Sequence, residues 1–441
     1  MNNSYISSIK ATARTVHDFI YNNIKLSDQE HATFIAGSLI ALQDDKFRKH
    51  CKEDDYATNN EANRFINEMM EAIKSQIEAC KGFDKPDKRI IILEEFSFIK
   101  RNEQLKKIVT IEKRNWVAVQ YLLNVLEKGV YDIAKKYPQY DILGAFYDQF
   151  TKYSASDQQS LGIVLTPHHA AQFMSDLLEI NENDVVLDTC CGSASLLLTA
   201  GGAAKQSIGV ELNSRMAAIS LANMIIKELP TYIWLGNSFD EEIKEEIKTY
   251  KPTKLIINPP YSQQDKELSF IENGLDLLQP GGMGVAIMPV SCANKGDSES
   301  KFLRKSILSK HKLIASFIMP EQLFAPMVGV NTIICLFEAY SAKNDPAFLA
   351  YIKDDGFELT KSEGRIDKNN KWPNIKNEFM TLYNNRQEEN KKSVIVDIKN
   401  DDEWSLISHM IIHEDVYPDE FFIPHIQSYL MYLIQGGSKN V

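Results

Sequence analysis

The sequence predicts an α/β protein in which helices cover a mostly parallel sheet and a helical domain precedes it. Seven short apolar runs, separated by helix-length segments, follow one another after residue 184. Runs that are apolar on both faces are typical of parallel strands buried between helices. Upstream, apolar residues recur every three and four positions, as in amphipathic helices. The runs are 185–188, 207–211, 232–236, 254–258, 283–289, 313–320 and 331–338.

Three domains are expected from these changes of pattern. Residues 1–150 form an N-terminal helical domain, in which "NRFINEMMEAIKSQIEAC" and "NWVAVQYLLNVLEKGVYDIAKKY" are the clearest helices and Pro138 marks a break. Residues 151–340 form the sheet domain, with ligands expected at the carboxyl ends of its strands. Residues 341–441 form a polar extension in which "KSEGRIDKNNKWPNIKNE" resembles a loop. Its last segment, 421–437, has amphipathic helical spacing and either caps the sheet domain or docks on a partner.

Composition restricts the function further. No run of about 18 apolar residues is present, which argues against a membrane span, and the first residues lack a secretory signal pattern, so a cytoplasmic location is expected. The six cysteines contain no CxxC pair, which favours reduced, buried thiols. A net charge of −11 argues against a whole surface that binds nucleic acid. It leaves open a local basic groove, or a partner that supplies the phosphate contacts.

The first two strands end in groups that suit a ligand. The stretch "VVLDTCCGSASLLLTA" reads as a strand, Asp188, a small-residue turn around Gly192 and a helix. It is not GxGxxG, so a dinucleotide pyrophosphate loop fits poorly. The second strand ends at Glu211, whose carboxylate either accepts the two hydroxyls of a ribose or caps the next helix.

The fourth strand ends in "LIINPPYS", in which Asn258 precedes two prolines and Tyr261. Asn-Pro favours turns, so this stretch alone indicates only a rigid strand exit. Alternatively, Pro259 and Pro260 hold neighbouring hydrogen-bond acceptors in fixed positions at the edge of the sheet.

The order of these motifs resembles the Rossmann-like, S-adenosylmethionine-dependent amino-methyltransferases. It is most similar to the N6-adenine DNA methyltransferases of the modification-subunit type, found in type I and related restriction–modification systems. The resemblance extends from about Gly162 to Glu338 and implies a class I methyltransferase core with a mostly parallel, seven-stranded sheet.

The resemblance also implies which residues bind S-adenosylmethionine. The family's usual glycine and proline are replaced here by Ala194 and Thr189, and alanine tolerates a positive φ badly. Asn237 stands where an aspartate is more common, but its amide oxygen can still accept from the cofactor's adenine. The implied cofactor-binding residues are Thr166 and Pro167, Asp188, Cys191, Gly192 and Ser193, Glu211 and Leu212, and Asn237 and Ser238.

In such enzymes the NPPY residues activate an adenine amino group, whose lone pair is otherwise delocalised into the ring. Asn258 would supply its side-chain oxygen and Pro259 its carbonyl, both held by the prolines, to stabilise the positive charge that develops on nitrogen. Tyr261 would stack on an adenine that has left the duplex. Phe324 either packs against the same base or belongs to the core. This chemistry requires no metal, and the adjacent His168 and His169 diverge on a helix, so no metal site is expected.

Other functions stay open. Protein glutamine-N5 methyltransferases use the same acceptors but usually lack the upstream Thr-Pro motif, and a cofactor-binding scaffold without activity is a further alternative. A nicotinamide oxidoreductase is disfavoured by the missing glycines. The expected partners are double-stranded DNA and a separate DNA-specificity subunit, with a restriction subunit as a further candidate. No membrane partner is expected, and oligomerisation is left open.

Overall fold

The structure is a computed structural model, and it describes most of the chain. The described residues are 3–24, 26–53, 59–80, 86–136, 146, 166–261, 267–294, 298–325, 329–341, 345–360, 364–400 and 402–410. Within these ranges no helix has the length and apolarity needed to cross a membrane. The expected helix at 421–437 lies outside the described residues.

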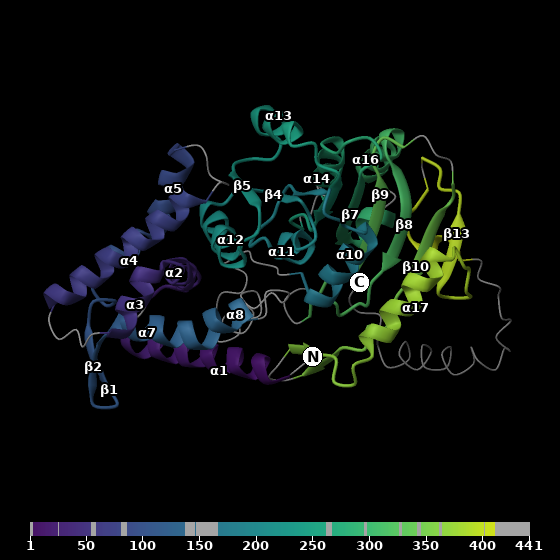
Figure 1. Cartoon of the computed structure of the whole chain (residues 1–441). Coiled ribbons are helices and arrows are strands. Elements are labelled where there is room, and N and C mark those ends of the chain that lie inside the picture. The colour runs from purple at the N-terminus through teal and green to yellow at the C-terminus, as the bar shows by residue number, and fades with distance from the viewer. Residues whose placement is uncertain are drawn as a thin grey trace, which may run out of the picture.

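The N-terminal part consists mainly of helices, as expected, with one hairpin that the helical interpretation missed. The hairpin pairs β1 (Ile108–Ile111) with β2 (Arg114–Val117) and extends away from the helices (Figure 1). The helices are α1 (Asn3–Phe19), η1 (Ile20–Ile24), α2 (Asp28–Ala41), α3 (Asp45–Glu53), α4 (Asn59–Ala79), α5 (Pro86–Phe96), α6 (Phe98–Arg101), α7 (Ala118–Leu126), η2 (Glu127–Tyr131) and α8 (Asp132–Lys136).

One mixed sheet forms the centre of the molecule, with strand order β13-β10-β8-β9-β7-β6-β3-β4-β5. The seven expected runs all form strands of it. The expected count of seven is wrong, because β10 and β13 extend the sheet to nine strands in the described part of the chain. Most pairs are parallel, but β9 is antiparallel to both its neighbours and β13 is antiparallel to β10. The strands are β3 (Val185–Asp188), β4 (Gln206–Glu211), β5 (Thr231–Leu235), β6 (Lys254–Ile257), β7 (Met283–Pro289), β8 (Lys312–Ile318), β9 (Thr332–Glu338), β10 (Ala347–Tyr351) and β13 (Ser393–Val396).

Helices cover both faces of the sheet (Figure 1). Along β6, Ile256 packs in one apolar core, and Leu255 and Ile257 pack in the other, as the alternation of side chains requires. Buried side chains of α10, α11, α12 and α17 belong to the first core, and those of α13, α14, α16 and α18 belong to the second. These helices, with α15, are α10 (His168–Leu178), α11 (Ser195–Gly201), α12 (Ser214–Lys227), α13 (Glu241–Thr249), α14 (Glu267–Asp276), α15 (Val290–Asn294), α16 (Ser298–Lys310), α17 (Trp372–Asn384) and α18 (Leu406–His409).

The loop interpretation of "KSEGRIDKNNKWPNIKNE" is wrong over much of its length. A second hairpin pairs β11 (Glu358–Thr360) with β12 (Gly364–Ile366), and α17 follows it. A proline stands in the first turn of α17, where its missing N–H costs no helical hydrogen bond. The buried Trp372, Phe379 and Leu382 give this helix an apolar face that the surrounding Lys and Asn residues obscure in the sequence.

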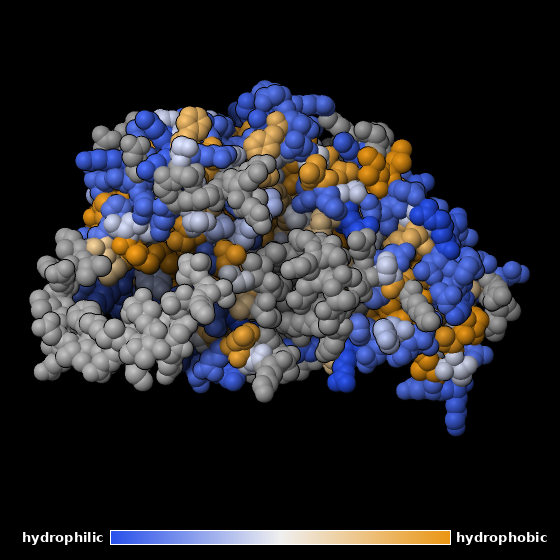
Figure 2. Space-filling view, turned by 180° about the vertical axis from the view of Figure 1, so that it is seen from behind, coloured by the Kyte–Doolittle hydropathy of each residue, from blue (hydrophilic) through white to orange (hydrophobic). Residues whose placement is uncertain are grey.

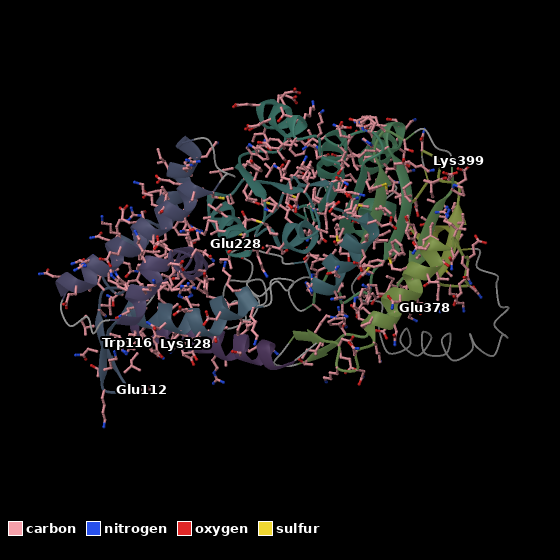
Figure 3. All side chains as sticks on the ribbon, in the orientation of Figure 1. Glu112, Trp116, Lys128, Glu228, Glu378 and Lys399 are labelled. Carbon is pink, nitrogen blue, oxygen red and sulfur yellow. The ribbon has the colours of Figure 1, made fainter. Side chains whose placement is uncertain are left out.

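The N-terminal helices pack on α12 through an apolar core that is continuous with one face of the sheet. Two ion pairs lie at this contact. Lys135 pairs with Glu228, which Figure 3 labels, and Arg215 lies 3.7 Å from Glu95. Seen from behind, polar residues cover much of the described surface, with apolar patches between them (Figure 2). The boundaries near 150 and 340 stay predictions.

Candidate functional site

The carboxyl ends of three adjacent strands bring the predicted site residues together. In the order β6-β3-β4, these strands end at Ile257, Asp188 and Glu211, so Asn258 follows the first of them directly. Chain order reverses here, because β4 lies on one side of β3 and β6 on the other. Such a switch point is where open α/β sheets bind ligands.

The turn after β3 is held against β4 by hydrogen bonds that its backbone amides donate. The Cys191 amide donates to the Val210 carbonyl over 3.0 Å. The Gly192 amide donates to Glu211 Oε2 over 2.9 Å, while Glu211 Oε1 accepts from the Asn213 amide over 2.8 Å. Both carboxylate oxygens of Glu211 are thereby oriented, and each keeps lone pairs for further donors.

Two residues of this turn adopt left-handed backbone conformations. Gly192 has a φ of 55°, and a Cβ added there would meet no atom within 4 Å, so the turn borders open space at this point. Ala194 precedes α11 with a φ of 65°, so alanine adopts the conformation that it tolerates badly, at a cost of roughly 1–2 kcal/mol. The Asn223 side chain supports the turn by donating to the Ser193 carbonyl over 2.7 Å.

Burial dominates the electrostatics of the turn. Burial, together with the nearby Glu211 carboxylate, raises the pKa of Asp188 to about 7, although its Oδ1 accepts from the Cys190 amide over 3.0 Å. Burial also raises the pKa of Glu211, against the opposing effect of its backbone hydrogen bonds. The thiols of Cys190 and Cys191 have pKa values raised well above the usual value for the same reason, so they are poor nucleophiles.

The exit of β5 presents one exposed and one buried polar group. Asn237 is exposed, and its side-chain oxygen accepts from the Phe239 amide over 3.1 Å. Ser238 is buried, and its carbonyl accepts from Asn273 Nδ2 over 3.0 Å. Leu212, which follows β4, is 71% exposed and Phe239 is 37% exposed.

The exit of β6 contains a hydrogen bond that fixes the Asn258 amide. Asn258 Nδ2 donates to Thr166 Oγ1 over 3.0 Å, and Thr166 is buried just before Pro167 at the start of α10. The Asn258 carbonyl accepts a weak bond from the Cys190 thiol, at 3.6 Å. Among the described residues, Asn258 Oδ1 is buried and has no hydrogen-bond partner. Such a group is costly to bury unless a ligand satisfies it.

Beyond Asn258, Pro259 is buried and Pro260 exposed. The Tyr261 hydroxyl is buried without a hydrogen-bond partner in the described part of the chain, and burial raises the pKa of its phenol, which therefore stays protonated. The Tyr261 ring meets the edge of Phe324 at 6.0 Å between centroids and 78° between planes. Phe324 is 1% exposed, so it belongs to the core and also contacts the NPPY segment.

The predicted residues therefore surround one edge of the sheet rather than scattering over the molecule. The Gly192 amide bonds to the Glu211 carboxylate, whose charge also acts on Asp188. Thr166 contacts Asn258, although the two are 92 residues apart in the sequence. No group of three or more His, Cys, Asp or Glu side chains suited to a metal occurs within the described ranges.

Two curated relatives are similar to the chain in sequence. The type II restriction enzyme and methyltransferase RM.BcgI of Heyndrickxia coagulans is 27% identical over 479 aligned residues, covering 99% of this chain and 72% of the relative. The type I restriction enzyme MjaVIII methylase subunit of Methanocaldococcus jannaschii is 26% identical over 250 residues, covering 54% of this chain and 40% of that subunit.

A solved structure has the same fold. The methyltransferase subunit of a type I restriction–modification system from Streptococcus thermophilus superposes with a TM-score of 0.61, at 15% identity, over 89% of this chain and 96% of that one. The expected class I methyltransferase fold is confirmed, apart from its strand count. The family model for N-6 DNA methylases matches residues 138–409, more than half of the 441 residues, and the chain belongs to the N-6 DNA methylase family.

Proposed function

We propose that the chain transfers a methyl group from S-adenosylmethionine to the N6 amino group of an adenine in DNA, as the modification subunit of a restriction–modification or related defence system. The orientation of the Asn258 amide carries this proposal. Its nitrogen donates to Thr166, so its buried oxygen, which has no hydrogen-bond partner in the described part of the chain, is available to a donor such as an amino group.

The turn after β3 fits S-adenosylmethionine. Open space at Gly192 leaves room for the ligand, Glu211 offers oriented oxygens for ribose hydroxyls, and the exposed Leu212 and Asn237 flank the position of an adenine ring. When bound, the cofactor supplies a methyl group on a sulfonium centre. The residues proposed to hold it are Thr166, Pro167, Asp188, Cys191, Gly192, Ser193, Glu211, Leu212, Asn237 and Ser238.

The adenine amino group would meet two acceptors, Asn258 Oδ1 and the Pro259 carbonyl. The nitrogen lone pair would take up the methyl group that the cofactor supplies, with the sulfur keeping the electrons of the former S–C bond. Positive charge would then develop on the nitrogen, and both acceptors would stabilise it. The amino group then loses a proton to water. Because Pro259, Pro260 and the Thr166 contact fix these acceptors beforehand, little reorganisation is needed in the transition state.

The extruded adenine would stack on Tyr261. The phenol ring packs nearly perpendicular to Phe324, and a face of the ring is the proposed stacking surface. Stacking of a base on an aromatic ring contributes about 1–3 kcal/mol and offsets part of the cost of leaving the duplex.

The proposed partners are double-stranded DNA, a separate DNA-specificity subunit and a restriction subunit. The net charge of −11 disfavours sequence-specific DNA binding by the surface of this chain alone. One relative is described as both restriction enzyme and methyltransferase, and it is longer than this chain, which spans 72% of it. The other is described as a methylase subunit, which supports an assembly of separate chains.

Mapping of modified bases tests the function. The chain is expressed in a host without adenine methylation, with and without its neighbouring genes, and N6-methyladenine is located by sequencing. We expect methylation at one defined site, only with the neighbouring genes, and none with Asn258→Ala. Cofactor binding without methylation under every condition would favour a scaffold, and methylated glutamine in a co-expressed protein would favour the other methyltransferase class.

A further inference from the structure

A buried ionic cluster joins the start of α10 to the segment that follows β10. His169 Nε2 lies 3.0 Å from Asp355 Oδ2, and Arg365 donates to both carboxylate oxygens, NH1 to Oδ2 over 2.8 Å and NH2 to Oδ1 over 2.6 Å. Asp355 is completely buried and His169 is 9% exposed. The three side chains come from three elements: His169 from α10, Asp355 from the segment that follows β10, and Arg365 from β12.

Aromatic rings fix the histidine in this cluster. The Phe357 ring stacks on His169 at 4.0 Å and 17°, and Trp372 meets it edge-on at 5.1 Å. Burial alone would raise the pKa of Asp355, but the hydrogen bonds from His169 and Arg365 hold it at about 2. The carboxylate is therefore ionised, paired and oriented, which makes the cluster a rigid joint.

Two short paths lead from this joint to the proposed adenine pocket. His169 stands in the first turn of α10, three residues after Thr166, whose hydroxyl fixes the Asn258 amide. On the other side, Arg365 NH1 also donates to the Leu323 carbonyl over 3.4 Å. Leu323 is followed by Phe324, the residue that supports the Tyr261 ring.

We propose that His169, Asp355 and Arg365 are positioning residues of the adenine pocket. They hold the wall that carries Thr166 at a fixed distance from the wall that carries Phe324, so that the amide acceptor and the stacking ring face one adenine together. This inference rests on the proposed function. It gives the segment after β10 a part in base binding, although that segment lies outside the strands whose ends bear the NPPY and cofactor motifs.

Stability alone does not call for such a cluster. Burying charges is expensive, and apolar side chains of similar size often stabilise a core at least as well as a buried ion pair. The bidentate contact of Arg365 with Asp355 instead fixes the relative orientation of the two side chains, because a guanidinium and a carboxylate pair in one planar arrangement.

The test compares variants of this joint with a matched pair at another place. His169→Gln and Arg365→Lys weaken the joint while preserving size or charge. The control is His311→Gln, because His311 is also buried and contacts an aspartate, Asp276, at 3.0 Å. His311 directly precedes β8 and Asp276 ends α14, and neither is a predicted site residue. Each variant is purified with the partner chains that support methylation of the mapped site.

Three measurements separate positioning from folding. A duplex with 2-aminopurine at the target adenine reports base extrusion by fluorescence, single-turnover kinetics report methyl transfer, and calorimetry reports S-adenosylmethionine binding. We expect His169→Gln and Arg365→Lys to slow transfer by about 10- to 100-fold and to reduce the fluorescence change. Cofactor affinity should stay within about threefold, and His311→Gln should transfer methyl groups at about the unchanged rate.

The outcomes distinguish the inference from the function on which it rests. Folded joint variants with unchanged transfer rate and fluorescence would overturn the positioning role while leaving the methyltransferase intact. An equal loss in the His311→Gln control would assign the effect to general destabilisation and would also overturn it. Absence of transfer by the unsubstituted complex would instead refute the proposed function. Should Arg365→Lys fail to fold, His169→Gln, which leaves the Arg365–Asp355 pair in place, gives the decisive result.

Discussion

Asn258 donates from its side-chain nitrogen to the hydroxyl of Thr166, and in this orientation its amide oxygen is left for another donor. An asparagine amide can turn over and exchange its oxygen for its nitrogen, which would present a donor to an incoming amino group. In the structure the threonine hydroxyl accepts from the amide nitrogen, so the amide oxygen faces away from Thr166. Thr166 was expected to meet the cofactor, and the structure adds a contact with Asn258.

Thr166→Val should therefore lower the rate of methyl transfer more than it lowers cofactor affinity. Valine keeps the shape of threonine but cannot accept a hydrogen bond, so the Asn258 nitrogen is left unsatisfied and the amide loses its preferred orientation. A loss of about 1–3 kcal/mol corresponds to roughly a 5- to 150-fold slower single-turnover rate. Thr166→Ser retains the hydroxyl and should transfer at close to the normal rate. Equal rates for the valine and serine variants would contradict the orienting role.

The Tyr261 ring should matter more than its hydroxyl. The hydroxyl is buried without a hydrogen-bond partner among the described residues, so Tyr261→Phe removes an unsatisfied polar group and should leave transfer within about threefold. Tyr261→Ala removes the stacking surface and should slow transfer by about 10- to 100-fold. The 2-aminopurine signal, measured for both variants, links the rate to base extrusion. A phenylalanine variant as slow as the alanine variant would show that the hydroxyl takes part.

The clustering of the motif residues was predictable from the sequence because their relationship is topological. Once Asp188, Glu211 and Asn258 were placed at the ends of parallel strands, they had to meet at one edge of a sheet. Their detailed contacts were not predictable. The Thr166–Asn258 bond joins residues 92 positions apart, and no local pattern specifies it.

The extension after residue 340 was predicted less well, for a different reason. β10 is a five-residue run, Ala347–Tyr351, in a polar neighbourhood, and it becomes a strand because it pairs with β8. Arg365 lies in a stretch whose Lys and Asn content suggested a loop. Its proposed role depends on Asp355, which meets both Arg365 and His169 only in the folded protein. Tertiary contacts override local composition in such segments.

The tip of the β1–β2 hairpin provides a test of backbone strain. Glu112, labelled in Figure 3, lies at the tip. Glu112 and Lys113 have φ values of 52° and 68°, a conformation for which two-residue turns favour asparagine and glycine. Glu112→Asn combined with Lys113→Gly should stabilise the hairpin by about 1–2 kcal/mol. Slower hydrogen exchange of the Ile108–Val117 amides, by roughly 5- to 30-fold, would report this. Glu112→Gln removes the charge but not the strain, so a similar slowing in that variant would assign the effect to charge instead.

Asp188 should make the protein less stable as the pH rises. Its folded pKa of about 7 exceeds its ordinary value of 3.8, so the folded state binds the proton more tightly than the unfolded state does. The stabilisation that this provides is complete below about pH 4 and is lost as the pH rises through about 7. Asp188→Asn keeps a hydrogen-bond acceptor without the charge. It should therefore raise the thermal midpoint at pH 8, by on the order of 2–4 °C, and raise it by clearly less at pH 5. Thermal melts from pH 5 to 8, with the exposed Asp240→Asn as the control, measure the difference. A gain at pH 5 as large as that at pH 8 would show that the buried charge is not its cause.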